Sequence, residues 1–178
     1  LTEYKSTFLE AYRRPLVSET LPKPKLWDAS NLNDDAITVD FINSTSKVGS
    51  KDLLQILSTY GFALIVNCPC NKVSVTKVAN MIGYIRETIF GGLWEFEANA
   101  TMADSAYTPK ELRPHTDSTY SLDAPGLQIL LCINYDATGG ESIMVDGFEA
   151  AQKLKKHDPA LYRALSHIDV TGIYRGDG

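Results

Sequence analysis

His115 and Asp117 stand two residues apart and are both of the types that bind transition metals. On an extended segment such side chains project to the same side, about 6–7 Å apart along the chain, so that both can reach one ion. With a second histidine they would form the two-His-one-carboxylate face of non-haem iron(II), which leaves positions open for a chelating 2-oxo acid and dioxygen. Alone, a His-x-Asp triplet is more often a solvated surface loop, and both interpretations stay open on this motif.

Helices are expected on both sides of this motif. Apolar residues at three-to-four spacing predict helices over 50–57 and over about 74–89. Asp146 is placed to cap a third helix, and Asp158-Pro159 gives the start signal of a fourth, with proline at its first position.

The strands are expected to be short and joined by turns. Apolar segments predict strands at 61–68, 127–134 and 142–145, with a further strand at 36–41 and an extended stretch at 93–96. The tight turn at 136–140 would make the strands on either side of it antiparallel. Turns in place of crossover helices favour an antiparallel sheet over a doubly wound one.

Composition excludes several classes of protein. The chain has 178 residues, 44% of them hydrophobic and 22% charged, which is ordinary for a globular domain. A net charge of −5 without a large basic cluster argues against nucleic acid as a partner. No run approaches the roughly 20 apolar residues of a membrane span, so no membrane association is expected.

The three cysteines, Cys68, Cys70 and Cys132, are too few and too uneven for a disulfide framework. They indicate a reducing intracellular compartment, mitochondrial or cytoplasmic. Cys68-Pro69-Cys70 lacks a second Cys/His pair at zinc-site spacing, so a strand end is the better interpretation than half of a metal site.

A series of motifs gives the His-x-Asp triplet its context. Between about Tyr60 and Ala151 the chain resembles the trimethyllysine and γ-butyrobetaine dioxygenases, relatives of taurine dioxygenase. The matching stretches are Ile85-Arg86-Glu87-Thr88-Ile89-Phe90-Gly91, Trp94, Asp104-Ser105-Ala106-Tyr107-Thr108, His115-Thr116-Asp117-Ser118-Thr119-Tyr120, Thr138-Gly139-Gly140 and Val145-Asp146-Gly147-Phe148. Their common order along about half of the chain is far more specific than any one of them.

The resemblance implies a mainly β fold with flanking helices, a double-stranded β-helix or jelly roll, in which His115 and Asp117 bind iron(II). Ser142 stands where relatives place a threonine that contacts 2-oxoglutarate. The implied reaction decarboxylates 2-oxoglutarate to succinate and CO2 and hydroxylates a small trimethylammonium amino acid. Ascorbate is a candidate further cofactor, and a homodimer is a candidate assembly.

The resemblance also implies a substrate site. Trp94 and Tyr107 match aromatic positions that hold a trimethylammonium group through cation–π attraction, and Phe90 replaces a tyrosine of the relatives. The alternative is that Phe90 and Trp94 fill the core. Asp104, where butyrobetaine enzymes carry an amide, could pair with the α-ammonium of trimethyllysine and so favours its hydroxylation at C3, the first step of carnitine biosynthesis. A γ-butyrobetaine hydroxylase and a non-catalytic barrel module that binds a methylated ligand are the alternatives.

The pattern is incomplete within the chain. His157 and His167 fall in expected helices and are rejected as the third iron ligand. Relatives place that histidine, and the arginine that binds 2-oxoglutarate, on late barrel strands, which are expected beyond Gly178. Residues 1–48 are therefore interpreted as a linking or wrapping segment after a missing N-terminal domain, and 49–178 as the front part of the catalytic domain, inactive by itself.

Overall fold

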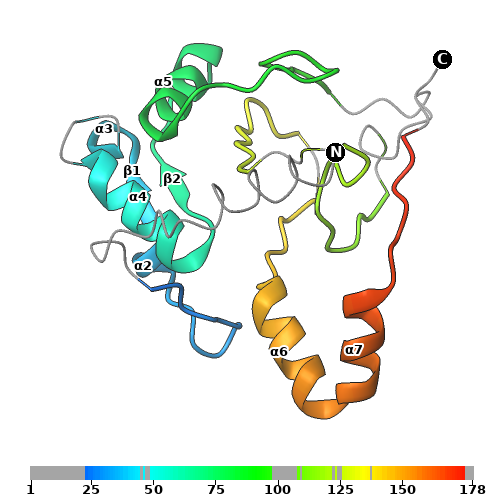
Figure 1. The fold of residues 1–178 in the computed structure, drawn as a ribbon. Helices are drawn as coiled ribbons and strands as arrows, with labels where there is room; N and C mark the ends of the chain where they lie inside the picture. Colours follow the sequence, from blue (N-terminus) through cyan, green and yellow to red (C-terminus); the bar gives the residue numbers. More distant parts are fainter. Residues whose placement is uncertain are drawn as a thin grey trace, which may run out of the picture.

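The computed structural model describes residues 23–44, 46, 49–97, 108, 110–121, 123, 126–136 and 138–174 (Figure 1). Helices and strands occupy the two ends of this range, and the long middle part carries neither. In chain order the elements are α2 (Asp34–Ile37), β1 (Thr38–Asp40), α3 (Phe41–Ser44), α4 (Gly49–Tyr60), β2 (Leu64–Val66), α5 (Lys72–Ile82), α6 (Gly147–His157) and α7 (Pro159–His167).

Strands β1 and β2 pair in parallel, with Val39 opposite Ile65. The connection between them runs through α3 and α4, so this pair is a crossover unit. The expected strands at 36–41 and 61–68 are confirmed in shortened form, whereas the expectation of turn-connected antiparallel strands is wrong for this pair. Beyond β2, Asn67 adopts a positive φ of 56° and donates its side-chain amide to Asp40 at 2.7 Å. Together with the backbone N–H of Ile42, this hydrogen bond lowers the pKa of Asp40.

The core lies where α4 and α5 pack beside this sheet. Phe41, Leu53 and Val78 are buried against one another, and Leu53 exposes only 1% of its surface. Ile65 packs on the same cluster, as does Ile129 from the irregular middle part of the chain. The apolar stripes predicted for the two helices therefore pack in the core, as expected.

A segment around Trp27 connects this core to α6. The Trp27 indole is buried and donates to the carbonyl of Tyr60 at 2.8 Å, while its backbone N–H donates to Asp146 Oδ2 at 3.0 Å. Next to it, Lys153 Nζ of α6 donates to Asp28 Oδ2 at 2.7 Å. Residues more than a hundred positions apart are thus held together by polar contacts.

Helices α6 and α7 form an antiparallel pair, side by side in orange and red in Figure 1. Both start at the predicted caps. Asp146 Oδ1 accepts from the N–H groups of Phe148 and Glu149, and Asp158 caps α7 in the same way. The helix predictions at 50–57, at Asp146 and at Asp158 are confirmed.

Two other predictions are corrected. The helix expected to run to Ile89 ends at Ile82, because Gly83 takes an extended conformation and its N–H donates back to Ala79; glycine weakens a helix interior by about 1 kcal/mol relative to alanine. The segments 127–134 and 142–145, expected as paired strands, do not form strands. A strand is stable only beside other strands, and neither segment has a ladder partner among the described residues. No described helix combines the length and apolar character needed to cross a bilayer.

Candidate metal and substrate site

The side chains of His115 and Asp117 meet. His115 Nε2 lies 3.1 Å from Asp117 Oδ1, and each side chain exposes 52% of its surface. His115 lies in an irregular stretch, and Asp117 begins a turn over 117–120 in which Ser118 has a positive φ of 58°. Two donors that bind one ion from adjacent positions, each at about 2.1 Å, stand roughly 3 Å apart. The spacing of the pair therefore suits a shared metal ion.

The other polar atom of each side chain makes a hydrogen bond of its own. His115 Nδ1 is 2.6 Å from the carbonyl oxygen of Arg113, and Gln128 Nε2 donates to Asp117 Oδ2 at 2.9 Å. An Nδ1–H donated to a carbonyl places the lone pair on Nε2, the tautomer that a metal ligand needs. The remaining nitrogen and oxygen, His115 Nε2 and Asp117 Oδ1, contact each other.

Charge at the pair favours the protonated form of His115. The Arg113 carbonyl raises the pKa of His115, and the Asp117 carboxylate raises it further. A metal ion binds the neutral imidazole, so its binding at this pair would release the proton that Asp117 helps to retain. In the described ranges no group of three His, Cys, Asp or Glu side chains could hold a metal ion, so the pair stands without a third ligand there.

Aromatic rings form a continuous row nearby. Phe90 and Trp94 stack at 5.0 Å with an interplanar angle of 19°, and Phe96 also stacks on Trp94, at 4.5 Å. Tyr174 meets the Phe90 ring edge-on at 5.8 Å and lies 5.0 Å from Tyr120. Because Trp94 stacks on both Phe90 and Phe96, a quaternary ammonium group cannot lie between these rings and would have to contact their exposed faces or edges.

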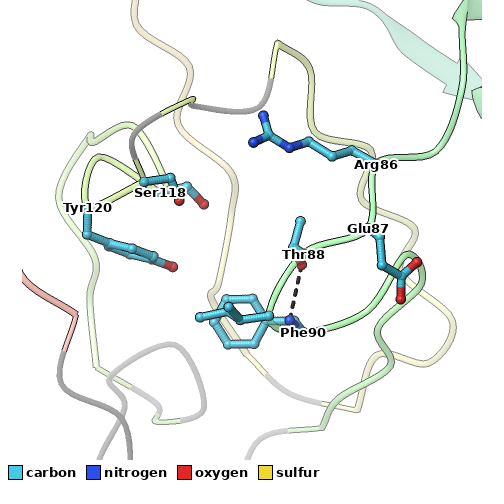
Figure 2. Close-up of a pocket in the computed structure, with 8 residues that line it drawn as sticks. Arg86, Glu87, Thr88, Phe90, Ser118 and Tyr120 are labelled. Atoms are coloured by element: carbon cyan, nitrogen blue, oxygen red, sulfur yellow. Dashed lines mark hydrogen bonds between the residues drawn. The ribbon is translucent and has the colours of Figure 1, made fainter.

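A cavity of about 250 Å³ lies between segment 86–90 and the turn that begins at Asp117. Segment 86–90 forms one wall, and Ser118, Tyr120 and Ser121 form the other. Figure 2 shows the Arg86 guanidinium extending toward the Ser118 turn, with the Tyr120 hydroxyl directed into the same space. Thr88 is occupied in its own turn, where its hydroxyl donates to Gly91 O and accepts from the N–H of Phe90.

Residues 21–178 match the family model of the taurine catabolism dioxygenase TauD, TfdA family. The chain belongs to this family. Membership implies a jelly-roll fold and, in general, dependence on iron(II) and 2-oxoglutarate. The described strands and helices are compatible with part of such a fold.

The chain is also similar to individual enzymes, among them two trimethyllysine dioxygenases and one γ-butyrobetaine dioxygenase. The chain is 35% identical to the mitochondrial trimethyllysine dioxygenase of Rattus norvegicus over 158 residues, which is 88% of this chain and 38% of the relative. It is 36% identical to the human mitochondrial enzyme over 129 residues, 72% and 31% of the two chains. Human γ-butyrobetaine dioxygenase is 34% identical over 122 residues, 67% and 32%. The chain thus spans between 31% and 38% of the length of these three relatives.

For a TauD, TfdA family member, the structure brings together only some of the residues expected at the site. His115 meets Asp117, and Phe90 meets Trp94. Ser142 is exposed in the stretch that precedes α6, and its side chain has no hydrogen bond within the described part of the chain. Asp104 and Tyr107 lie outside the described residues.

Several site residues were not identified from the sequence. Gln128 follows Asp117 by eleven positions, and no local pattern connects them. Tyr174 reaches Phe90 from beyond α7, again without a local signal. Tyr120 and Arg86 lie in the matching motifs, but the sequence did not indicate that they line a cavity.

Proposed function

We propose that the protein to which this chain belongs is an iron(II)- and 2-oxoglutarate-dependent dioxygenase that hydroxylates N6,N6,N6-trimethyllysine at C3. The observation that carries the proposal is the contact of His115 Nε2 with Asp117 Oδ1 at 3.1 Å. It occurs in a member of a dioxygenase family whose relatives include trimethyllysine dioxygenases over most of this chain.

In this proposal His115 and Asp117 hold the iron through Nε2 and Oδ1. The Arg113 carbonyl and the Gln128 amide fix the two side chains from behind, which keeps the two donor atoms aimed at one point. Iron(II) held there would supply the oxidising chemistry, with 2-oxoglutarate and dioxygen as co-substrates and with succinate and CO2 as the products of 2-oxoglutarate. Ser142 is proposed to donate its hydroxyl to 2-oxoglutarate, and ascorbate to keep the iron reduced.

The substrate is proposed to lie along the aromatic row. Trp94 exposes 41% of its surface, and the proposal places against it the trimethylammonium group, which cannot donate hydrogen bonds and is attracted to aromatic rings. Phe90 continues this surface to the cavity. Tyr107 is proposed to complete the cage, and Asp104 to pair with the α-ammonium of trimethyllysine.

A second candidate is the hydroxylation of γ-butyrobetaine to carnitine, because a human γ-butyrobetaine dioxygenase is also a relative at 34% identity. A non-catalytic barrel module that binds a methylated ligand is the third. The third iron ligand and the arginine for 2-oxoglutarate are proposed to come from sequence outside this chain, so that 49–178 is the front part of the catalytic domain. The proposed compartment is mitochondrial or cytoplasmic.

The test is turnover by the intact protein. Iron(II), 2-oxoglutarate and ascorbate are supplied with trimethyllysine or γ-butyrobetaine, and succinate and the hydroxylated product are measured together. We expect faster turnover of trimethyllysine. Asp117→Ala should lower it by more than ~100-fold, since even residues behind metal ligands contribute about 10–100-fold.

Asp136→Ala, which removes an exposed carboxylate from the 136–140 region, is the matched control and should leave turnover unchanged. Succinate at background level with every trimethylated amine would favour the non-catalytic module. Preferential turnover of γ-butyrobetaine would favour the second candidate instead.

A further inference from the structure

The cavity beside Phe90 offers hydrogen-bond donors and no inward carboxylate among its described lining residues. Arg86, Ser118, Tyr120 and Ser121 contribute a guanidinium and three hydroxyls. Glu87 also belongs to the lining, but its carboxylate points away from the other labelled side chains in Figure 2. It lies instead against Gly92, where an added Cβ would come within 2.9 Å of Glu87 Oε2. The space is thus complementary to an anion.

Arg86 is available to such an anion. Its guanidinium is paired with Asp123 at 3.3 Å, and the Asp123 side chain is 89% exposed while that of Arg86 is 38% exposed. Ion pairs between solvent-exposed groups add little stability, so a ligand carboxylate can replace Asp123 at small cost. A guanidinium can hold a carboxylate with two parallel hydrogen bonds, which fixes the orientation of the ligand as well as its charge.

We propose that Arg86 binds the carboxylate of the methylated substrate, with Ser118 and Tyr120 as additional hydrogen-bond donors. This inference rests on the proposed function, because it takes the substrate to be a trimethylammonium amino acid. Phe90 would then separate two binding regions, the aromatic row for the methylated end and the Arg86 cavity for the acid end. Ser118 directly follows Asp117, so an acid held there lies beside the turn that carries the candidate iron ligand.

The experiment compares Arg86→Gln with wild type in the intact protein. Three constants are measured: the KM for trimethyllysine, the KM for its carboxamide analogue and the KM for 2-oxoglutarate. Equilibrium binding of both substrates without dioxygen is measured as well. Loss of a hydrogen-bonded charge pair should weaken binding of trimethyllysine about 10–100-fold and leave binding of the carboxamide unchanged. Arg163→Gln, at an exposed position of α7, is the matched control and should change none of these values.

Asp123→Asn separates substrate binding from a structural ion pair. If Asp123 only competes with the substrate for Arg86, this variant should bind trimethyllysine as tightly as wild type or a few-fold more tightly. If it reproduces the Arg86→Gln defect, the Arg86–Asp123 pair is structural and the inference is overturned.

Three other outcomes also overturn the inference: equal weakening of trimethyllysine and its carboxamide, a raised KM for 2-oxoglutarate alone, and no change at all. The second of these would assign the cavity to the co-substrate. Failure of the wild-type protein to act on any trimethylated amine is a different result. That result would remove the proposed function itself, whereas an active wild type with an equally active Arg86→Gln variant would remove only the role of Arg86.

Discussion

The packed unit around α4 and α5 and the irregular part that carries the His–Asp pair differ most in burial. Leu53 and Ile37 expose 1% and 2% of their surface, whereas Leu130 and Ile143 expose 70% and 72%. Both regions contain large apolar side chains, but only the first region buries them. The residues of the candidate site therefore lie in the region where burial contributes least to fixing their positions.

Local polar and aromatic contacts take the place of burial in that second region. The Arg113 carbonyl and the Gln128 amide orient the His115–Asp117 pair. Tyr174 contacts both Tyr120 and Phe90, and so connects the turn that carries Asp117 to the aromatic rings. Such contacts depend on the path of the chain, and each is worth only about 0.5–1.5 kcal/mol. The site is therefore ordered by several weak contacts, and the core by a few strong ones.

The largest effect should follow from truncating a leucine in each region. Leu53→Ala removes a fully buried side chain from the core and should lower the free energy of unfolding by about 2–5 kcal/mol. Leu130→Ala makes the same chemical change at an exposed position and should stay within about 0.5 kcal/mol of wild type. Urea unfolding of the two variants gives both values. Equal losses would mean that the irregular region is packed as firmly as the core.

The same contrast decides what the sequence could predict. Helices α6 and α7 begin at Asp146 and Asp158 as expected, because a capping carboxylate binds N–H groups two or three residues away and the signal is local. The strands expected at 127–134 and 142–145 are not present as a ladder, because a strand is defined by neighbours that a single segment does not specify.

At the site, the spacing of His115 and Asp117 predicted that the two side chains could converge, and they do meet. The contacts from other segments that hold the pair in place were not predictable. Gln128 follows Asp117 by eleven positions, and Tyr174, which follows α7 in the chain, contacts Phe90, which precedes α6. Spacing identifies residues of one segment, whereas contacts between segments require the fold.

A smaller effect is expected at Gln128, where it tests whether one polar contact orients the pair. Gln128→Leu removes the donor to Asp117 Oδ2 and leaves both proposed iron ligands in place. Affinity of the intact protein for iron(II) should fall about 10–100-fold, as is usual for a residue that holds a metal ligand from behind. Anaerobic titration with iron(II), read by calorimetry, measures it. Gln152→Leu on α6 is the control, and an unchanged affinity in both variants would refute the role of Gln128.

The smallest effect concerns the Asp28–Lys153 contact, which links the segment around Trp27 to α6. The ammonium of Lys153, helped by Ser30, lowers the pKa of Asp28, and Asp28 in turn raises the pKa of Lys153. A carboxyl group whose pKa is lower in the folded state stabilises it fully above the unfolded value, about 3.9, and loses that contribution as the pH falls. Lys153→Gln removes the largest cause of the lowered pKa, so its Tm should decline less steeply than that of wild type between about pH 5 and pH 2.

The raised pKa of Lys153 has the opposite sign. Its contribution is complete below about pH 10.4 and is lost above that value, so the alkaline decline should also be shallower in Lys153→Gln. Thermal unfolding followed by circular dichroism gives both limbs, with Lys77→Gln on α5 as a control away from the link. Parallel curves for wild type and Lys153→Gln would mean that Asp28 and Lys153 contribute nothing to holding α6 against the segment around Trp27. The backbone contact of Trp27 with Asp146 would then remain as the polar connection between the core and α6.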